Sequence, residues 1–435
     1  MNNKAKTTPK KPDGKPALMP KLRFPEFRKA APWRVRKLNE VLFEAKHRNR
    51  TLELGPNDVL SVSREHGCVN QIELLGRSYA GVTVKDYHVV EHGDIVYTKS
   101  PLKRNPYGII KENKGKRGIV STLYAVYRPF PGYSATYLDH FFSVDYNLNA
   151  YLQPIVRKGA KNDMKVNNAD VLRGEICVSE LPEQQKISKC LSSMNELIAA
   201  QAREVDALKI HKKGLMQQLF PCEGETQPRL RFPEFQDADG WGETQLQKIA
   251  RPVTDRAATG DGDNVLSLSV ELGLVLQSDY FTKKVAGDIV ERYFKLLRND
   301  FVYNDRTTKA STFGTIKRLS KYSGGIVSPI YKCFRFHPDE NPVFWEWYFE
   351  SGSHDNQLGG LVNEGARSGR FNISITQFLS TFAWCPDAPE QQIIADCLSS
   401  LDDLIAAQTQ KLETLKTHKK GLMQQLFPSP VEVVA

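Results

Sequence analysis

The chain has 435 residues, of which 40% are hydrophobic and 25% are charged. These proportions are those of a globular protein and exclude a wholly disordered chain. No apolar run approaches the roughly 18 residues of a membrane helix, and no apolar segment follows the basic N-terminus as it does in a secretory signal. The seven cysteines are scattered without a CxxC pair, which disfavours a zinc ribbon or a secreted disulfide scaffold and favours a reducing cytoplasm.

The net charge of +10 is unevenly distributed along the sequence. Residues 28–181 contain 24 basic and 16 acidic residues, whereas residues 236–388 contain 17 basic and 19 acidic ones. A basic balance favours an anionic partner, although a solubilising surface has the same composition. Any contribution of net charge to binding is therefore expected from the first half of the chain.

The chain begins with a basic tail and a globular domain. Residues 1–19, rich in Lys and Pro, are expected to be disordered. The domain at 20–181 opens with PKLRFPEF, and its runs GDIVYTK (93–99) and GIVSTLYAVYRPF (118–130) predict strands. The aromatic segment at 137–152 predicts a helix. The domain is therefore of mixed α/β type.

A long helix is predicted next, over 182–221. Proline is tolerated in the first turn, at Pro182, and ends the helix at Pro221. Apolar or seam positions recur with alternating steps of 3 and 4 residues, which is the heptad seam of a coiled coil. Polar residues interrupt the seam at Gln201 and Lys212, and Gly214 predicts a local bend or a close approach.

The second half of the chain repeats the first. After a linker at 222–227, a second domain at 228–388 opens with PRLRFPEF and contains a predicted helix at 342–351. Residues 389–428 then match 182–221 at 27 of 40 positions, and a tail occupies 429–435. Such an internal duplication is the strongest signal in the sequence.

The globular regions are also duplicated, with greater divergence. VLSVSREHGCVNQ at 59–71 resembles VLSLSVELGLVLQ at 265–277, and GIVSTLY at 118–124 resembles GIVSPIY at 325–331. Each half therefore joins a variable domain to a nearly invariant helix.

Connectivity predicts how the two helices pair. The second domain follows the end of the first helix after a short linker, so the second helix must run back to pack on the first. We expect an α+β protein, with two tandem mixed α/β domains separated by a long antiparallel two-helix coiled coil. The expected arrangement is pseudo-two-fold and nearly circular.

The sequence contains no recognised catalytic or metal-binding pattern. Asn105-Pro106-Tyr107 lacks the second proline of the NPPY motif of amino-methyltransferases, and no HExxH or phosphate-loop spacing occurs. We therefore expect a chain with no catalytic residues, no metal and no bound cofactor of its own.

Basic, turn-rich loops mark the positions where the two domains differ most, as expected of a recognition surface on a fixed scaffold. Lys and Arg with interspersed polar side chains suit the contact of phosphates and base edges, and the alternative is a set of solvated hairpin tips. In the first domain the predicted DNA-binding residues are Lys99, Lys103, Arg104, Asn105, Tyr107, Lys114, Lys116, Arg117, Arg157, Lys158, Lys161 and Asn162. In the second they are Arg306, Thr307, Thr308, Lys309, Lys317, Arg318, Arg367, Ser368, Arg370 and Asn372.

Across about 20–430, the pattern resembles the specificity subunit of type I restriction-modification systems. The resemblance rests on the duplicated RFPEF openings with a following Trp, the PEQQ helix starts and the KKGLMQQLF helix ends, together with DFVYN (300–304) and GIVSP (325–329). It implies two target-recognition domains, each reading one half of a bipartite, asymmetric DNA target. The conserved helices would set the spacing between half-sites. The acidic balance of the second domain departs from a uniformly basic DNA reader.

The resemblance also implies partners. Two methyltransferase subunits would use S-adenosylmethionine to methylate adenine N6, and restriction subunits are a further expected partner. The residues expected to contact partners, or alternatively to pack on the protein's own helices, are Phe24, Phe27, Phe232, Phe235, Lys212, Lys213, Lys419 and Lys420. The alternatives are a stand-alone bipartite DNA-binding protein or repressor, an enzyme with an unrecognised site, and a coiled-coil scaffold.

Overall fold

A computed structural model describes residues 19–158, 164–258, 261–280, 290–306, 312–361 and 372–428. The chain forms two compact units, one of Met1–Ala202 with Lys411–Ala435 and the other of Arg203–Gln410. We call them unit 1 and unit 2. Each unit contains one globular region, the beginning of one long helix and the end of the other.

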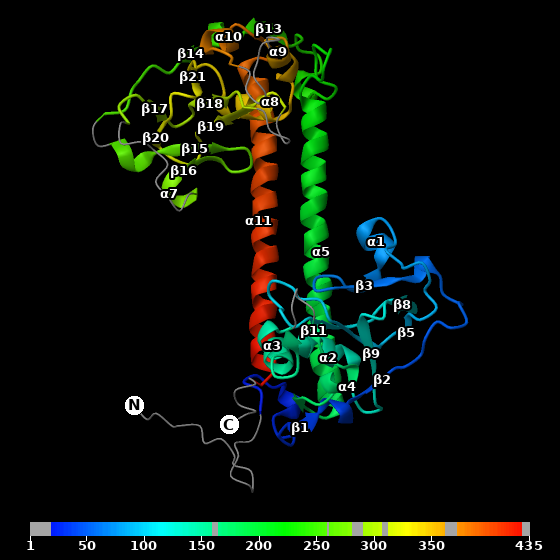
Figure 1. Cartoon of the computed structure of the whole chain (residues 1–435). Coiled ribbons are helices and arrows are strands. Elements are labelled where there is room, and N and C mark those ends of the chain that lie inside the picture. Colours follow the sequence, from blue (N-terminus) through cyan, green and yellow to red (C-terminus); the bar gives the residue numbers. More distant parts are fainter. Residues whose placement is uncertain are drawn as a thin grey trace, which may run out of the picture. The chain divides into compact units, whose positions relative to one another are not determined.

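Unit 1 contains short antiparallel strands and helices in mixed order (Figure 1). Its strands are β1 (Arg34–Lys37), β2 (Leu42–Glu44), β3 (Leu60–Ser63), β4 (Gly67–Asn70), β5 (His88–Val90), β6 (Ile95–Thr98), β7 (Ile109–Glu112), β8 (Gly118–Val120), β9 (Tyr124–Pro129), β10 (Arg157–Lys158), β11 (Met164–Lys165) and β12 (Glu175–Val178). Its helices are α1 (Gln71–Leu75), α2 (Ala135–Phe142), α3 (Asp145–Leu152), α4 (Asn168–Val171) and the first part of α5 (Leu181–Leu219). The largest sheet has the order β2-β9-β6-β7, and β1–β12, β3–β4 and β5–β8 are separate pairs.

Unit 2 has the corresponding strand order. Its strands are β13 (Gly242–Gln245), β14 (Ala250–Pro252), β15 (Leu266–Ser269), β16 (Gly273–Leu276), β17 (Phe294–Leu297), β18 (Phe301–Asn304), β19 (Thr315–Arg318), β20 (Gly324–Val327), β21 (Lys332–Phe336) and β22 (Phe382–Cys385). Its helices are α6 (Leu246–Ile249), α7 (Gln277–Tyr280), α8 (Pro342–Glu350), α9 (Asp355–Gly359), α10 (Ile375–Leu379) and the first part of α11 (Ala388–Leu426). The sheet order β14-β21-β18-β19 repeats that of unit 1. The duplication in sequence is therefore a duplication of topology.

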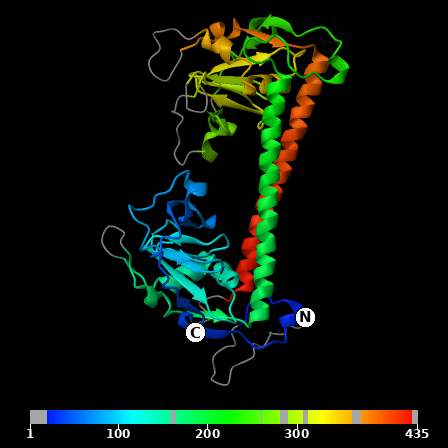
Figure 2. The same cartoon turned by 90° about the vertical axis from the view of Figure 1, so that its right-hand side faces the viewer.

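Each unit has a core into which the long helices pack. In unit 1, Trp33 and Tyr137 lie in one buried cluster with Leu191 of α5 and Phe427 at the end of α11. In unit 2, Trp241 and Phe344 pack with Phe220, and the cluster includes Leu398 of α11. In both units the early residues of one helix meet the late residues of the other, so the helix segments within each unit run antiparallel. In unit 1 these are the green and red segments that lie side by side in Figure 2.

The helices agree with their heptad pattern, with one difference at a glycine. Leu191, Gln201 and Val205 of the predicted seam are buried, as a coiled coil requires. The expected close approach at Gly214 does not occur, because a Cβ there would meet nothing within 4 Å. Gly214 lies within the continuous helix α5.

The aromatic segment at 137–152 forms two helices rather than the one predicted. The helix α2 ends at Phe142, where the backbone N–H of Ser143 donates to Asp139, and Val144 is extended before α3 starts. The helical aromatic pattern continues across the break, so the pattern alone does not reveal it. The predicted helix at 342–351 is confirmed as α8. No helix among the described residues combines the length and the hydropathy of a membrane span.

Candidate nucleic-acid interface

The loop between β6 and β7 of unit 1 is built to present two cations. Asn105 is fully buried, where its Oδ1 accepts from Arg64 at 2.9 Å and its Nδ2 donates to Asp145 at 3.0 Å. Tyr97 donates from its hydroxyl to the Tyr107 carbonyl at 2.8 Å. Asn105 therefore shapes the loop from inside instead of reaching outward.

The outer residues of the same loop are free to meet a ligand. Lys103 and Arg104 are exposed, while the Arg104 carbonyl accepts from Asn149 of α3 at 3.0 Å. Lys99 is half-buried at the end of β6, and burial lowers its pKa, with Glu44 opposing. The loop thus holds its backbone fixed while two cationic side chains project from it.

Several other predicted contacts in unit 1 already have carboxylate partners. Lys114 pairs with Asp139 at 2.8 Å, and Arg117 pairs with Glu91 at 2.9 Å. Burial acts to lower the pKa of Lys114, but the Asp139 charge and its hydrogen bond outweigh burial and raise that pKa. Lys116 is exposed with no ion-pair partner in the described part of the chain. Arg157 is exposed in β10, which continues into Lys158.

In unit 2 the predicted cations on β19 face the helix α8. Lys317 pairs with Glu350, and Arg318 pairs with Glu346 at 2.6 Å. The Lys317 and Arg318 side chains are 15% and 12% exposed, so they fasten β19 to α8 and offer little surface to a ligand. Arg306 and Asn372 are exposed, at the edges of undescribed segments. The other predicted contacts lie outside the described residues: Lys161, Asn162, Thr307, Thr308, Lys309, Arg367, Ser368 and Arg370.

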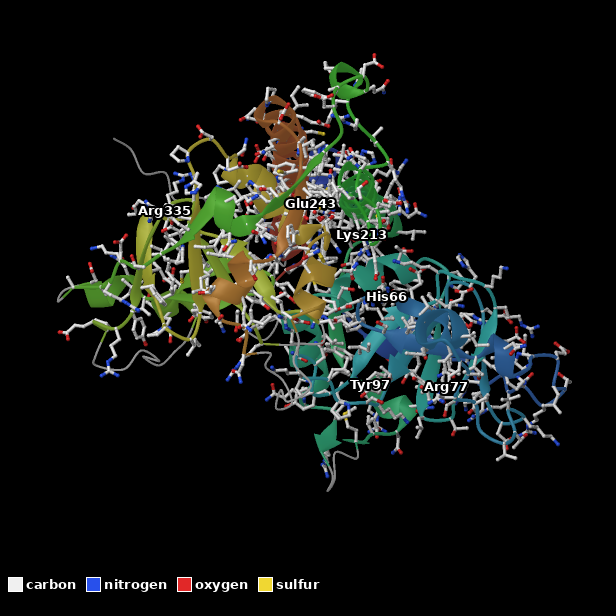
Figure 3. The ribbon with its side chains drawn as sticks, turned by 90° about the horizontal axis from the view of Figure 1, so that it is seen from above. His66, Arg77, Tyr97, Lys213, Glu243 and Arg335 are labelled. Atoms are coloured by element: carbon white, nitrogen blue, oxygen red, sulfur yellow. The ribbon has the colours of Figure 1, made fainter. Side chains whose placement is uncertain are left out.

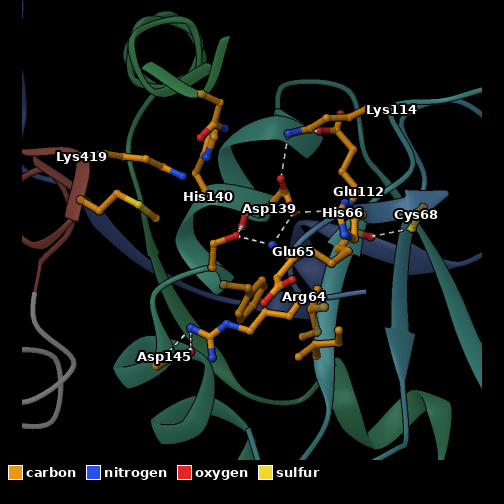
Figure 4. Close-up of a pocket in the computed structure, with 18 of the residues that line it drawn as sticks. Arg64, Glu65, His66, Cys68, Glu112, Lys114, Asp139, His140, Asp145 and Lys419 are labelled. Carbon is orange, nitrogen blue, oxygen red and sulfur yellow. Dashed lines mark hydrogen bonds and ion pairs between the residues drawn. The ribbon is translucent and has the colours of Figure 1, made fainter. Parts of the chain in front are cut away.

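Two adjoining cavities lie in unit 1 between its globular region and its helix segments. The first, of about 640 Å³, is lined by β7, α2 and α5, and it includes Lys111, Asp139 and His140 (Figure 4). The second, of about 560 Å³, is lined by Arg104 of the β6–β7 loop and by the last turns of α11. Both contain Arg64, Asp145 and Lys419. Sequence reasoning missed Arg64 and Asp145, since nothing local relates them to the loop that they support.

In each unit, the RFPEF motif is joined to the PEQQ motif by two hydrogen bonds from its arginine to a glutamate. In unit 1 the buried Arg23 makes two hydrogen bonds of 2.7 Å to Glu183, and the Leu22 N–H donates to the Gln425 carbonyl near the end of α11. In unit 2, Arg231 binds Glu390 at 2.6 and 2.9 Å. Each opening therefore ties the start of one helix to the end of the other. Their repetition within invariant segments is the sequence signal that points to these pairs.

Of the residues expected to contact partner subunits, the four phenylalanines are half-buried and two of the four lysines are exposed. Phe24 and Phe232 are half-buried and pack on the cores of their units, and Phe27 and Phe235 are half-buried as well.

Among the predicted partner-binding lysines, Lys213 and Lys420 are exposed; Lys213 is labelled in Figure 3. Lys212 pairs with Asp402 and lies over the Trp347 ring at 3.9 Å, whereas Lys419 faces the cavities.

No group of His, Cys, Asp and Glu within the described ranges is arranged to hold a metal ion. Cys68 lines the first cavity, and burial raises the pKa of its thiol to about 12. The exposed cations of unit 1 described above, Lys103, Arg104 and Lys116, are positioned to meet an anionic ligand.

Two solved structures that match this chain come from type I restriction-modification systems. The S subunit of a type I restriction-modification system from M. genitalium matches with a TM-score of 0.53 and 10% identity, covering 94% of this chain and 99% of that one. A chain from a study of complex assembly and conformational transition of the type I R-M system matches with a TM-score of 0.51 and 15% identity, covering 91% and 97%. No protein-family model and no curated protein matches the sequence. At these identities the likeness concerns the fold, and the chain has the fold of a type I specificity (S) subunit.

Proposed function

We propose that this chain is the sequence-specific DNA-recognition subunit of a type I restriction-modification complex. The observation that carries the proposal is the duplication of one topology, with nearly identical helices and diverged loops, in a chain with the S-subunit fold. Divergence concentrated in loops on a fixed scaffold is how a family of recognition surfaces changes specificity without changing its assembly.

The proposal includes a bipartite target. Each globular region reads one half-site, and the antiparallel helices set the distance between half-sites, as subunit spacing does in dimeric DNA readers. The pseudo-two-fold, nearly circular arrangement and the domain boundaries expected from the sequence belong to this proposal. Two unequal regions imply an asymmetric target.

Catalysis is assigned to partners. Two methyltransferase subunits dock on the repeated elements, because two similar surfaces suit two identical partners. The partners bind S-adenosylmethionine and extrude the target adenine from the duplex to methylate it. Restriction subunits join the same complex, and this chain supplies recognition without chemistry of its own.

Co-expression with the proteins encoded beside this chain, among which the proposal expects a methyltransferase subunit, tests the proposal. The purified complex should methylate adenines within one bipartite sequence, mapped genome-wide, whereas either protein alone should methylate none. Methyl transfer by this chain alone would make it an enzyme. Specific DNA binding without any stable methyltransferase complex would favour a stand-alone repressor.

A further inference from the structure

The second cavity of unit 1 is a recess dominated by positive charge. Its walls include Arg104, Lys416, Lys419 and Lys420, with Arg64 at the boundary with the first cavity. Asp145 is the one carboxylate among the described residues that line it, and Arg64 already pairs with it at 2.7 Å. We call this site the basic recess. Of the other cations, Lys416 pairs at 2.7 Å with Glu413, which does not line the recess, and no ion pair within the described residues joins Arg104, Lys419 or Lys420 to a carboxylate.

Lys419 differs from Arg104, Lys416 and Lys420 in that its side chain is partly buried. It is half-buried in both cavities, and within the described ranges it makes no hydrogen bond or ion pair. In Figure 4 it points from α11 toward His140, and no interaction joins it to the side chains drawn there. Burial and the nearby Lys111 lower its pKa, and the charge of Asp139 opposes them without outweighing them, which is the expected response of a partly buried ammonium group with no ion-pair partner.

The equivalent lysine of unit 2, Lys212, has two stabilising contacts that Lys419 lacks. The two lysines occupy the same position of the repeated HKKG sequence. Lys212 forms an ion pair with Asp402 and lies over the ring of Trp347.

In the repeat alignment, Asn195 stands in unit 1 where unit 2 has Asp402, and His140 stands where unit 2 has Trp347. Both differences remove a group that stabilises the ammonium internally. Burial also lowers the pKa of His140 to about 4, despite Asp139, so at neutral pH this histidine adds no charge.

We propose that the basic recess binds a phosphodiester group of the DNA backbone, held by Lys419 with help from Arg104 and Asn195. The inference rests on the proposed DNA-recognition function and restricts this contact to unit 1. Arg104 joins the recess to the β6–β7 loop, and Arg, Lys and amide side chains are the usual donors to backbone phosphates. This continuity with the predicted DNA loop favours a nucleic acid over an acidic segment of a partner subunit.

The salt dependence of DNA binding by the full chain tests the recess. Fluorescence anisotropy with a duplex bearing the mapped target, at several salt concentrations, gives the slope of log K against log[salt]. Lys419→Gln should weaken binding and reduce the magnitude of that slope by about 0.9, the value for one phosphate contact. Lys419→Arg should retain the slope.

Two further variants separate the recess from general charge effects. Asn195→Asp places in unit 1 the carboxylate that unit 2 has, so it should reduce the slope as Lys419→Gln does. Lys411→Gln is the matched control, because Lys411 is an exposed lysine of α11 that lines neither cavity, and it should leave the slope unchanged.

The outcomes distinguish this inference from the proposed function. An unchanged slope in Lys419→Gln, with normal DNA binding by the wild type, overturns the recess alone. A Lys419→Gln variant that binds DNA normally but assembles less well with the methyltransferase also overturns it, because the recess would then bind a partner subunit.

If the wild type binds no DNA, the proposed function fails. Inorganic phosphate then probes the recess directly: thermal stabilisation of the wild type but not of Asn195→Asp supports an oxyanion site, and equal melting temperatures overturn it.

Discussion

At the scale of single residues, the repeated RFPEF and PEQQ motifs hold the chain in place where it enters each unit, a role that amino-acid composition does not reveal. Arg23 reaches the Ala30 and Ala31 carbonyls in addition to Glu183, and its side chain is only 5% exposed. Arg231 repeats this pattern with the Ala238 carbonyl. A bidentate pair of this kind fixes direction as well as distance, so the motif sets the angle at which the chain enters each unit.

Arg23→Ala should therefore destabilise unit 1 strongly. Loss of the guanidinium leaves the Glu183 carboxylate buried and unpaired, which costs about 3–5 kcal/mol in other proteins. Chemical denaturation followed by far-UV circular dichroism measures the change. Arg34→Ala is the control, because Arg34 and Glu180 form an exposed pair at 3.5 Å that contributes about 0–1 kcal/mol. Equal losses in the two variants would contradict the role assigned to Arg23.

Buried histidines predict an acid-sensitive fold. His354 packs against Phe349 and Phe378, and burial lowers its pKa to about 3. Below pH 6.5 the unfolded chain gains a proton at this histidine and the folded chain does not, so stability falls as the pH falls. The loss is about 1.4 kcal/mol per pH unit until the folded pKa is reached.

His354→Phe removes this titration and should flatten the pH dependence. Thermal unfolding of wild type and variant between pH 7.5 and pH 5 gives the comparison. The advantage of the wild type over the variant should shrink as the pH falls. Parallel stability curves would show that another group accounts for the acid sensitivity.

At the scale of elements, the sequence predicts the helices and strands that depend on neighbouring residues. It misses contacts between residues far apart in the chain. The helices α5 and α11 follow from a heptad repeat within the helix itself, and strands β6 and β9 lie within runs of alternating or apolar residues. The pairing of β2 with β9 joins strands far apart in the chain, so no local pattern contains it. The same holds for the site, since exposed Lys103 and Arg104 were found from their loop, whereas Arg64 and Asp145 required the fold.

Alanine substitutions at two glycines of unit 1, one of them in the β6–β7 turn, should lower stability by clearly different amounts. Gly108 has φ +94°, and a Cβ there would lie 2.1 Å from the Thr98 carbonyl oxygen. Gly132 has φ +97°, but a Cβ there would meet nothing within 4 Å. Gly132→Ala should therefore cost about 1–2 kcal/mol, the ordinary penalty for a left-handed residue.

Gly108→Ala should cost clearly more, because the turn backbone must move. It should also weaken DNA binding, since that turn supports Lys103 and Arg104. Thermal denaturation and anisotropy measure the two effects. Similar stabilities for the two alanine variants would show that the close contact is easily relieved.

At the scale of the whole molecule, each unit separates what holds it together from what varies. In unit 1 the residues that tie the two helices together, Leu22, Arg23, Glu183 and Gln425, lie outside 28–181, in the repeated motifs. The segment 28–181 contributes backbone carbonyls to Arg23, at Ala30 and Ala31, which do not depend on the side chains there. The exposed loop residues Lys103 and Arg104 lie inside that segment. Recognition can therefore change without altering how the helices are tied.

Replacement of 28–181 by the corresponding domain of another type I specificity subunit should consequently redirect one half of the target. The replacement must supply aromatic residues equivalent to Tyr137 and Phe141, because both pack on Phe427 at the end of α11. Genome-wide mapping of methylated adenines in cells with the chimaeric complex should show a new first half-site beside an unchanged second half-site and spacing. A change in both half-sites would mean that the two units read DNA jointly, and an unchanged target would place recognition outside the exchanged segment.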